Sequence, residues 1–212
     1  MKRTDLKADD VTEYIWTHSD NLARILYLYA KLNKAFVYVQ GMNEILAVIY
    51  YCFWKDNDPE MFDQQQVESD VFMCFSNLMA EVGDGFMISF DSEQGGLFEK
   101  CKRIDSILKR ADFTVWNKLK ELNCDTKFFA IRWVMVLLCQ DLEMPDCIRI
   151  WDTLLADERR FEFLEYISAS IVLRHRTLII KGDFARVCTC LQDAAKNIAD
   201  IPILIKEAHQ LL

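Results

Sequence analysis

Apolar residues recur along the chain at the spacing that places them on one face of an α-helix. Near the N-terminus this pattern is formed by Leu22, Ile25, Leu26, Tyr29 and Leu32. We expect Ser19 or Asp20 to cap this helix, because their side-chain oxygens can accept hydrogen bonds from its free backbone N–H groups. Asn33-Lys34 is expected to end the helix, and residues 36–39 form a β-prone connector.

The same periodicity predicts helices over most of the remaining chain. The predicted segments are 67–82, two helices within 98–122 that part near 111–112, 128–142, a helix whose first turn holds Pro145, and 161–180, which Gly182 ends. The nearly continuous apolar character of 128–142 predicts a buried helix. Glycines cluster between 83 and 96, which indicates either a subdomain joint or a surface loop. With six glycines and three prolines, the chain has too few turn residues for a β-rich fold, so we expect an all-α fold.

Length, charge and hydropathy narrow the class of protein. The 212 residues suit one large domain or two small ones, and a hydrophobic share of 52% is typical of a globular chain. A net charge of −8 argues against a nucleic-acid partner. The longest apolar run, Ile45–Trp54, is about half as long as the roughly 20 residues that span a bilayer, so no direct membrane insertion is expected. The N-terminus is charged and has no apolar core, so it is not expected to be a secretory signal.

The sequence lacks the residue patterns that several kinds of catalytic or binding site need. The sequence has no phosphate-binding glycine loop, and its three histidines stand far apart, so no metal site is expected. Its eight cysteines include no Cys-x-x-Cys pair, which favours buried free thiols in a reducing compartment. Asp141 and Glu143 are expected to be helix-end charges rather than an acid/base pair. We therefore expect a chain that does not turn over a substrate alone and has no cofactor of its own.

One segment, Tyr38-Val39-Gln40-Gly41-Met42, joins an extended run to the start of an apolar helix. A glutamine followed by glycine at such a junction presents a side-chain amide at an edge of the fold. The alternative is a polar turn residue with no further role.

A second block lies far downstream. It consists of Phe128 to Trp133, with arginine and tryptophan as its last two residues, and then Arg149-Ile150-Trp151-Asp152. The upstream segment resembles the Tyr-x-Gln-Gly-Met motif of TBC-domain Rab GTPase-activating proteins. The downstream block resembles the Phe-x-x-Arg-Trp and Arg-x-Trp-Asp motifs of the same family, and the three motifs come in the same order. The matches extend over most of the chain.

The resemblance implies an all-helical domain, a multi-helix orthogonal array. Residues 1–212 would form its C-terminal majority, without the usual N-terminal helices. Such a domain binds a GTP-bound Rab-family GTPase and accelerates its hydrolysis of GTP. Gln40 matches the family's glutamine finger, which orients the attacking water. Arg3 is the candidate for the arginine finger of an Ile-x-x-Asp-x-x-Arg motif, although the isoleucine and aspartate would fall before Met1. Mg²⁺ and GTP would belong to the partner.

The resemblance also marks the neighbours of Gln40. The expected partner-binding residues are Tyr38, Gly41, Met42, Asn43 and Glu44. Tyr38 and Met42 would pack beside Gln40 and aim it, whereas Asn43 and Glu44 would contact the switch regions of the GTPase. The alternatives are plain core packing for the first two residues and an ordinary first helical turn for the others.

The downstream block is expected to be structural. Its residues are Arg132, Trp133, Arg149, Trp151 and Asp152. We expect them to hold helices together rather than to touch the GTPase, with an ion pair between Arg132 or Arg149 and Asp152.

The implied function is activation of a Rab GTPase in vesicle trafficking. The implied location is cytoplasmic, with peripheral recruitment to endomembranes through the Rab partner. Two alternatives stay open: a catalytically inactive Rab-binding or scaffold module, and a helical scaffold with no GTPase partner.

Overall fold

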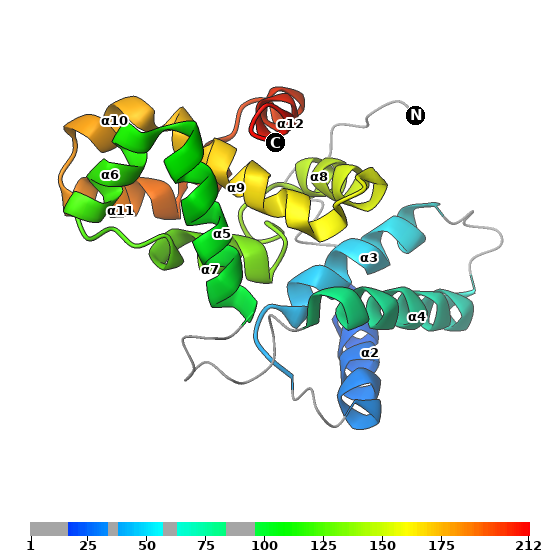
Figure 1. Ribbon diagram of the computed structural model, residues 1–212. Helices are drawn as coiled ribbons and strands as arrows, with labels where there is room; N and C mark the ends of the chain where they lie inside the picture. Colours follow the sequence, from blue (N-terminus) through cyan, green and yellow to red (C-terminus); the bar gives the residue numbers. More distant parts are fainter. Residues whose placement is uncertain (1–16, 34–37, 57–62, 84–95) are drawn as a thin grey trace.

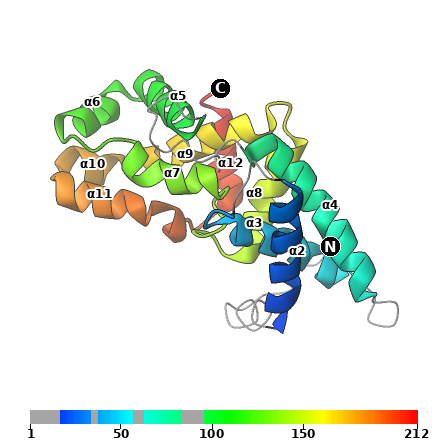
Figure 2. The same ribbon diagram turned by 90° about the horizontal axis from the view of Figure 1, so that it is seen from below.

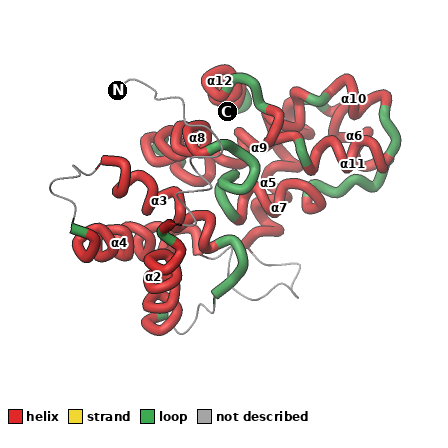
Figure 3. Tube along the Cα trace, turned by 180° about the vertical axis from the view of Figure 1, so that it is seen from behind, coloured by secondary structure: helices red, strands yellow, loops and turns green. Residues whose placement is uncertain are grey.

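A computed structural model describes residues 17–33, 38–56, 63–83 and 96–212 of the chain. Within these ranges every regular element is a helix and none is a strand (Figure 3), so the predicted all-α fold is confirmed. The described elements are α2 (Ser19–Leu32), α3 (Met42–Asp56), α4 (Gln64–Val82), α5 (Gly96–Ala111), α6 (Phe113–Glu121), α7 (Lys127–Met135), α8 (Met144–Ala156), η2 (Arg160–Glu162), α9 (Phe163–Arg174), α10 (Arg176–Lys181), α11 (Phe184–Gln192), η3 (Ala194–Asn197) and α12 (Ile201–His209).

Helices α2, α3 and α4 pack on one another at one end of the molecule (Figures 1 and 2). The predicted apolar face of α2 is buried at Leu22, Ile25 and Tyr29. The Tyr29 ring meets the Phe75 ring of α4 edge-on, with 5.0 Å between the ring centroids. Leu32, expected on the same face, is exposed, because the end of α2 projects beyond α4 (Figure 1).

The start of α2 differs from the predicted cap. The backbone carbonyl of His18 accepts the first helical hydrogen bonds, so His18 is the N-cap and no side chain caps the helix. The prediction that Ser19 or Asp20 is the cap is therefore wrong, since both lie inside the first turn. The helix begins here because the His18 ring packs on Tyr50 and Trp54 of α3, with centroids 5.3 and 5.5 Å apart.

Helix α9 is the centre of the larger group of helices. It packs against α5, α7 and α12 (Figure 1), and its side chains are buried around the whole helix. The buried hydroxyl of Ser168 donates to the carbonyl of Leu164 at 2.8 Å, so the helix carries this polar group at little cost. A helix that is apolar on every face belongs in a core.

The predicted helix 161–180 is divided in the structure. Residue His175 caps both α9 and α10, and its ring nitrogen Nδ1 lies 2.9 Å from the carbonyl of Ile171. Gly182 ends α10, as predicted. A Cβ atom at Gly182 would lie 2.8 Å from the carbonyl oxygen of Leu178, so only glycine fits this close approach without a shift.

Two other helix boundaries are confirmed. Helices α5 and α6 part at Asp112, whose carboxylate accepts from the backbone N–H groups of Thr114 and Val115 at 3.0 and 3.1 Å. This is a side-chain N-cap of the usual kind. Pro145 lies in the first turn of α8, where the missing N–H leaves no helical hydrogen bond unmade.

The predicted buried helix 128–142 is wrong in its second half. Helix α7 ends at Met135, and residues 136–142 form a turn. Leu137 and Leu138 have positive φ angles of 52° and 65°, which a helix does not contain. The turn is held from outside, since the Trp151 indole N–H donates to the carbonyl of Leu137 at 3.1 Å. A tertiary contact therefore overrides the local apolar pattern.

Some predictions fall outside the described residues. They concern Lys34, half of the β-prone connector 36–39 and most of the glycine-rich segment 83–96. Asn33 is the C-cap of α2, as expected. In the ranges that the structure describes, no helix is both long and apolar enough to cross a membrane.

Candidate functional site

Gln40 lies at the corner of a tight turn just before α3. The backbone N–H of Met42 donates to the carbonyl of Val39 at 3.2 Å, which closes a four-residue turn. The third residue of this turn, Gly41, has a φ angle of 106°, and a type II turn needs a positive φ at this position. The side chain of Gln40 is exposed, so the sequence signal of an amide presented at an edge agrees with the structure.

Helix α3 begins directly behind this turn. The carbonyl of Gly41 accepts from the backbone N–H groups of Glu44 and Ile45 at 3.1 and 3.4 Å. Met42 and Ile45 are both fully buried in the core. Gln40 therefore lies two residues before Met42, the first residue of a helix that the core holds in place. That Met42 aims Gln40 stays a prediction.

The side-chain amide of Asn43 joins the residues around Gln40. Its oxygen accepts from the backbone N–H of Gly41 at 3.3 Å and from the Tyr38 hydroxyl at 3.1 Å. Its Nδ2 donates to the Glu44 carboxylate at 3.0 Å. Tyr38 is 48% exposed, so its ring is not a core residue. Contacts of these residues with a GTPase stay predictions.

The candidate arginine finger, Arg3, lies outside the described residues. Its role and its distance from Gln40 stay predictions.

Arg132 of the downstream block forms a buried ion pair, but not with the residue that was expected. Its guanidinium contacts both carboxylate oxygens of Asp141, at 2.5 and 3.1 Å, and donates to the carbonyl of Gln192 at 2.7 Å. Asp141 has no exposed side-chain surface. The prediction of Asp152 as the partner is wrong, because the turn after α7 places the Asp141 carboxylate against the Arg132 guanidinium. The expectation that Asp141 is a helix-end charge is also wrong, because Asp141 lies in the turn and its carboxylate is buried against Arg132.

Arg149 and Asp152 both lie on α8. Both are exposed, and no side-chain partner of either is found among the described residues. The predicted ion pair between them is therefore absent there. Trp133 and Trp151, by contrast, are buried, and the Trp133 ring packs on Phe129 with 5.4 Å between centroids.

Helix α3, which follows Gln40, packs on α8, which carries part of the second motif block. The thiols of Cys139, in the turn after α7, and Cys147, on α8, lie 3.6 Å apart. Burial raises the pKa of the Cys139 thiol well above its ordinary value, and the Cys147 thiol and the negative charge of Glu44 add to this rise. All eight cysteines are free, as predicted, but the prediction that they are buried is wrong for Cys74, which is exposed on α4.

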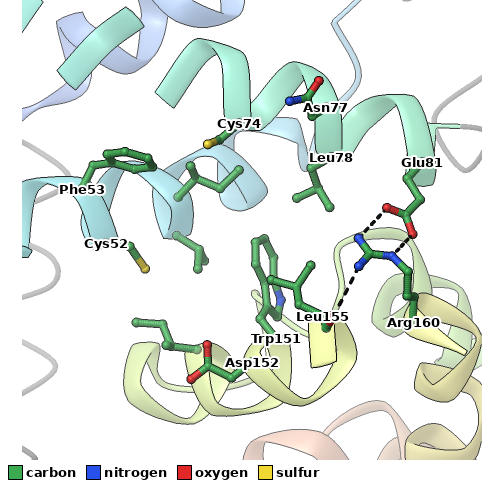
Figure 4. Close-up of a pocket in the computed structure, with 13 residues that line it drawn as sticks. Cys52, Phe53, Cys74, Asn77, Leu78, Glu81, Trp151, Asp152, Leu155 and Arg160 are labelled. Carbon is green, nitrogen blue, oxygen red and sulfur yellow. Dashed lines mark hydrogen bonds and ion pairs between the residues drawn. The ribbon is translucent and has the colours of Figure 1, made fainter. Parts of the chain in front are cut away.

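A groove of about 360 Å³ opens between α3, α4 and α8 (Figure 4). Most of its lining is apolar and includes Trp151, Leu78 and Leu155. The ion pair of Glu81 and Arg160, 2.6 Å long, borders one side of it (Figure 4). No sequence pattern indicated this groove, because one of its walls is α8, which is distant in sequence from α3 and α4.

In the ranges that the structure describes, no group of three or more His, Cys, Asp or Glu side chains is placed to hold a metal ion.

Comparison with known proteins gives a consistent family match. The model of the Rab-GTPase-TBC domain family matches residues 2–180. The chain is 41% identical over 194 residues to TBC1 domain family member 13 of Homo sapiens, covering 92% of this chain and 48% of that protein. It is 33% identical over 210 residues to a TBC domain-containing protein of Schizosaccharomyces pombe, covering 92% of this chain and 33% of that protein. The chain thus spans about half, or less, of these relatives.

The fold has a similar solved structure. The crystal structure of the Ypt/Rab-GAP domain of Gyp1p superposes with a TM-score of 0.79 at 27% sequence identity, covering 90% of this chain and 64% of that one. This likeness agrees with the helical arrangement described above.

Proposed function

This chain belongs to the Rab-GTPase-TBC domain family, and we propose that it is a GTPase-activating protein for a Rab-family small GTPase. The GTPase would bind in its GTP-bound state and would bring Mg²⁺ and the nucleotide with it. The chain would supply side chains in trans and turn over no substrate of its own. The observation that carries the proposal is the exposed Gln40 at the corner of a turn fixed by Gly41 and α3.

Gln40 would act as the glutamine finger. Its carboxamide has both a donor and an acceptor, so it can hold a water molecule in line with the γ-phosphate. A group that is fixed before the reaction avoids the reorganisation that water would need. The short tether to a buried helix start supplies this fixation, since Met42 cannot move without disturbing the core.

Arg3 would act as the arginine finger. During phosphoryl transfer, charge spreads over the phosphoryl oxygens, and a guanidinium beside them stabilises that charge. An arginine finger is worth roughly 10³- to 10⁵-fold in rate.

Recruitment to endomembranes would follow from binding to the Rab partner, and the cellular role would be in vesicle trafficking. The cytoplasm is the location that this role requires, because the GTPase presents its switch regions there.

The test is a single-turnover assay of GTP hydrolysis over a panel of Rab proteins, with and without the chain. For a Rab that responds, we expect Gln40→Ala to lower the acceleration about 10²-fold or more and Arg3→Ala about 10³-fold. Gln66→Ala is the matched control, because Gln66 is an exposed glutamine in the first turn of α4. It should leave the acceleration unchanged.

Failure of the folded chain to accelerate any Rab would refute the proposal. Binding to GTP-bound Rab without acceleration would favour a catalytically inactive scaffold instead. Loss of activity in Gln40→Ala but not in Arg3→Ala would exclude Arg3 as the finger.

A further inference from the structure

The side chain of Asn43 bridges the two sides of Gln40. Its Oδ1 atom accepts from Tyr38, two residues before Gln40, and from the N–H of Gly41, one residue after it. One oxygen atom therefore ties together the chain entering the turn and the chain leaving it. We propose that Asn43 is a positioning residue that holds the Gln40 turn, and not a contact to the GTPase. This inference rests on the proposed function and adds the means by which the finger is fixed.

The acceptor capacity of the Asn43 oxygen is already used within the chain. An amide oxygen has two lone pairs, and the Tyr38 hydroxyl and the Gly41 N–H occupy both at 3.1 and 3.3 Å. The amide nitrogen donates one of its two N–H groups to Glu44 at 3.0 Å. A GTPase group could reach the oxygen only by displacing one of its two donors, so a partner contact through this oxygen would undo the turn.

The residues before Gln40 are held less firmly by the core than the residues after it. On the leaving side, Met42 and Ile45 are buried and α3 fixes the backbone. On the entering side, Tyr38 is half exposed and Val39 is only partly buried. Glycine at the corner adds freedom, because it populates positive and negative φ angles about equally. The hydrogen bond from the Tyr38 hydroxyl to Asn43 joins the segment before Gln40 to α3 through side chains.

Glu44 orients the Asn43 amide. Its carboxylate accepts from the Asn43 Nδ2 at 3.0 Å, which leaves the Oδ1 atom of the same amide to accept from Tyr38 and Gly41.

The first experiment separates positioning from partner contact. Asn43→Ala and Tyr38→Phe are compared with the wild type in the hydrolysis assay, with the GTP-bound Rab as the varied substrate. We expect Asn43→Ala to lower kcat about tenfold or more with KM unchanged, because a displaced finger loses stabilisation that is made only in the transition state. Tyr38→Phe removes one of the two bonds to the oxygen and should have a smaller effect of the same kind.

The matched control is Asn117→Ala. Asn117 also donates its side-chain amide to a glutamate on its own helix, Glu121, at 2.7 Å, but it lies on α6. It should change neither kcat nor KM. A rise in KM with kcat unchanged in Asn43→Ala would overturn the inference, because that pattern marks a binding contact.

A second pair of variants tests the hydrogen-bond pattern itself. Asn43→Asp keeps the acceptor for Tyr38 and Gly41 but sets a carboxylate against Glu44, so kcat should fall. In the double variant Asn43→Asp with Glu44→Gln, the donor and the acceptor are exchanged between the two side chains, and most of kcat should return. If the double variant were as slow as Asn43→Asp, the bond between these side chains would not matter for the turn.

A readout without any GTPase keeps the two proposals apart. In ¹⁵N-labelled chain, the amide proton of Gly41 should exchange with solvent about tenfold faster in Asn43→Ala, because its acceptor is gone. If no Rab responded to the wild type while the Gly41 amide still exchanged faster in Asn43→Ala, the proposed function would have failed, but Asn43 would still be shown to hold the turn. Unchanged exchange would overturn the inference whatever the activity.

Discussion

The ion pair of Arg132 and Asp141 offers the sharpest test of how the turn after α7 is held. Replacement of Arg132 by methionine keeps much of the side-chain length but removes the guanidinium. The Asp141 carboxylate, which has no exposed surface, would lose contacts at 2.5 and 3.1 Å. The carbonyl of Gln192 would lose a donor at 2.7 Å.

The expected cost follows from these contacts. Removing one partner of a buried ion pair leaves an uncompensated charge and costs about 3–5 kcal/mol. Arg132 itself is partly exposed, so water can reach the site, and we expect the lower end, about 3 kcal/mol. For a chain of this length each kcal/mol lowers Tm by about 2–4 °C. The melting temperature should therefore fall by about 6–12 °C.

The assay is urea unfolding followed by circular dichroism, together with thermal melting. Arg149→Met is the matched control, because Arg149 is an exposed arginine on α8 without a side-chain partner among the described residues. It should change the free energy of unfolding by less than about 0.5 kcal/mol. The double variant Arg132→Met with Asp141→Leu removes both charges and should recover most of the loss.

Two results would refute this reasoning. One is a cost in Arg132→Met no larger than in the control. The other is a double variant less stable than Arg132→Met alone, which would mean that packing around Asp141, and not its charge, determines the stability of the turn.

Three further predictions concern other parts of the chain. Gly41→Ala places a Cβ atom on a residue with a φ of 106° and should lower the free energy of unfolding by about 1–2 kcal/mol; no loss in urea unfolding would contradict the turn geometry. The hydrogen bond from Arg160 lowers the pKa of Glu81 from its ordinary value of 4.5. The pair therefore stabilises the fold above pH 4.5, and only weakly, since both groups meet solvent. This contribution is lost as the pH falls through the lower folded-state pKa, so unfolding curves of the wild type and Arg160→Gln should converge in acid, and a constant gap would contradict the pairing. Burial raises the pKa of Cys101 to about 12, whereas Cys74 is exposed; alkylation with mass mapping should label Cys74 at once and Cys101 only after unfolding, and equal labelling would argue against this burial.

The helices could be predicted from the sequence where their own residues determine them. Asp112 ends one helix and begins the next through its own carboxylate, and Pro145 suits the position that it occupies. The apolar stretch 128–142 could not be divided correctly, because the turn depends on a hydrogen bond from Trp151, which lies in another helix. A local pattern carries no information about such a partner.

Only part of the candidate site could be predicted from the sequence. The turn around Gln40 could be foreseen from glycine after glutamine, because a positive φ is a local requirement. The bridging of Asn43 between Tyr38 and Gly41 could not, since it depends on where a side chain points. The partner of Arg132 was missed for a related reason: Asp152 and Asp141 are both near in sequence, and only the path of the turn decides between them.

The turn after α7 also determines how such domains can be recombined. Leu137 adopts its left-handed backbone where the indole of Trp151 meets its carbonyl, so the residues between them are one unit although they read as two motifs. A chimera of two related domains joined within 136–151 would combine one parent's turn with the other parent's indole. Crossover points in exposed positions of α5 or beyond Ala156 avoid this separation and are the better sites for exchanging segments within the family.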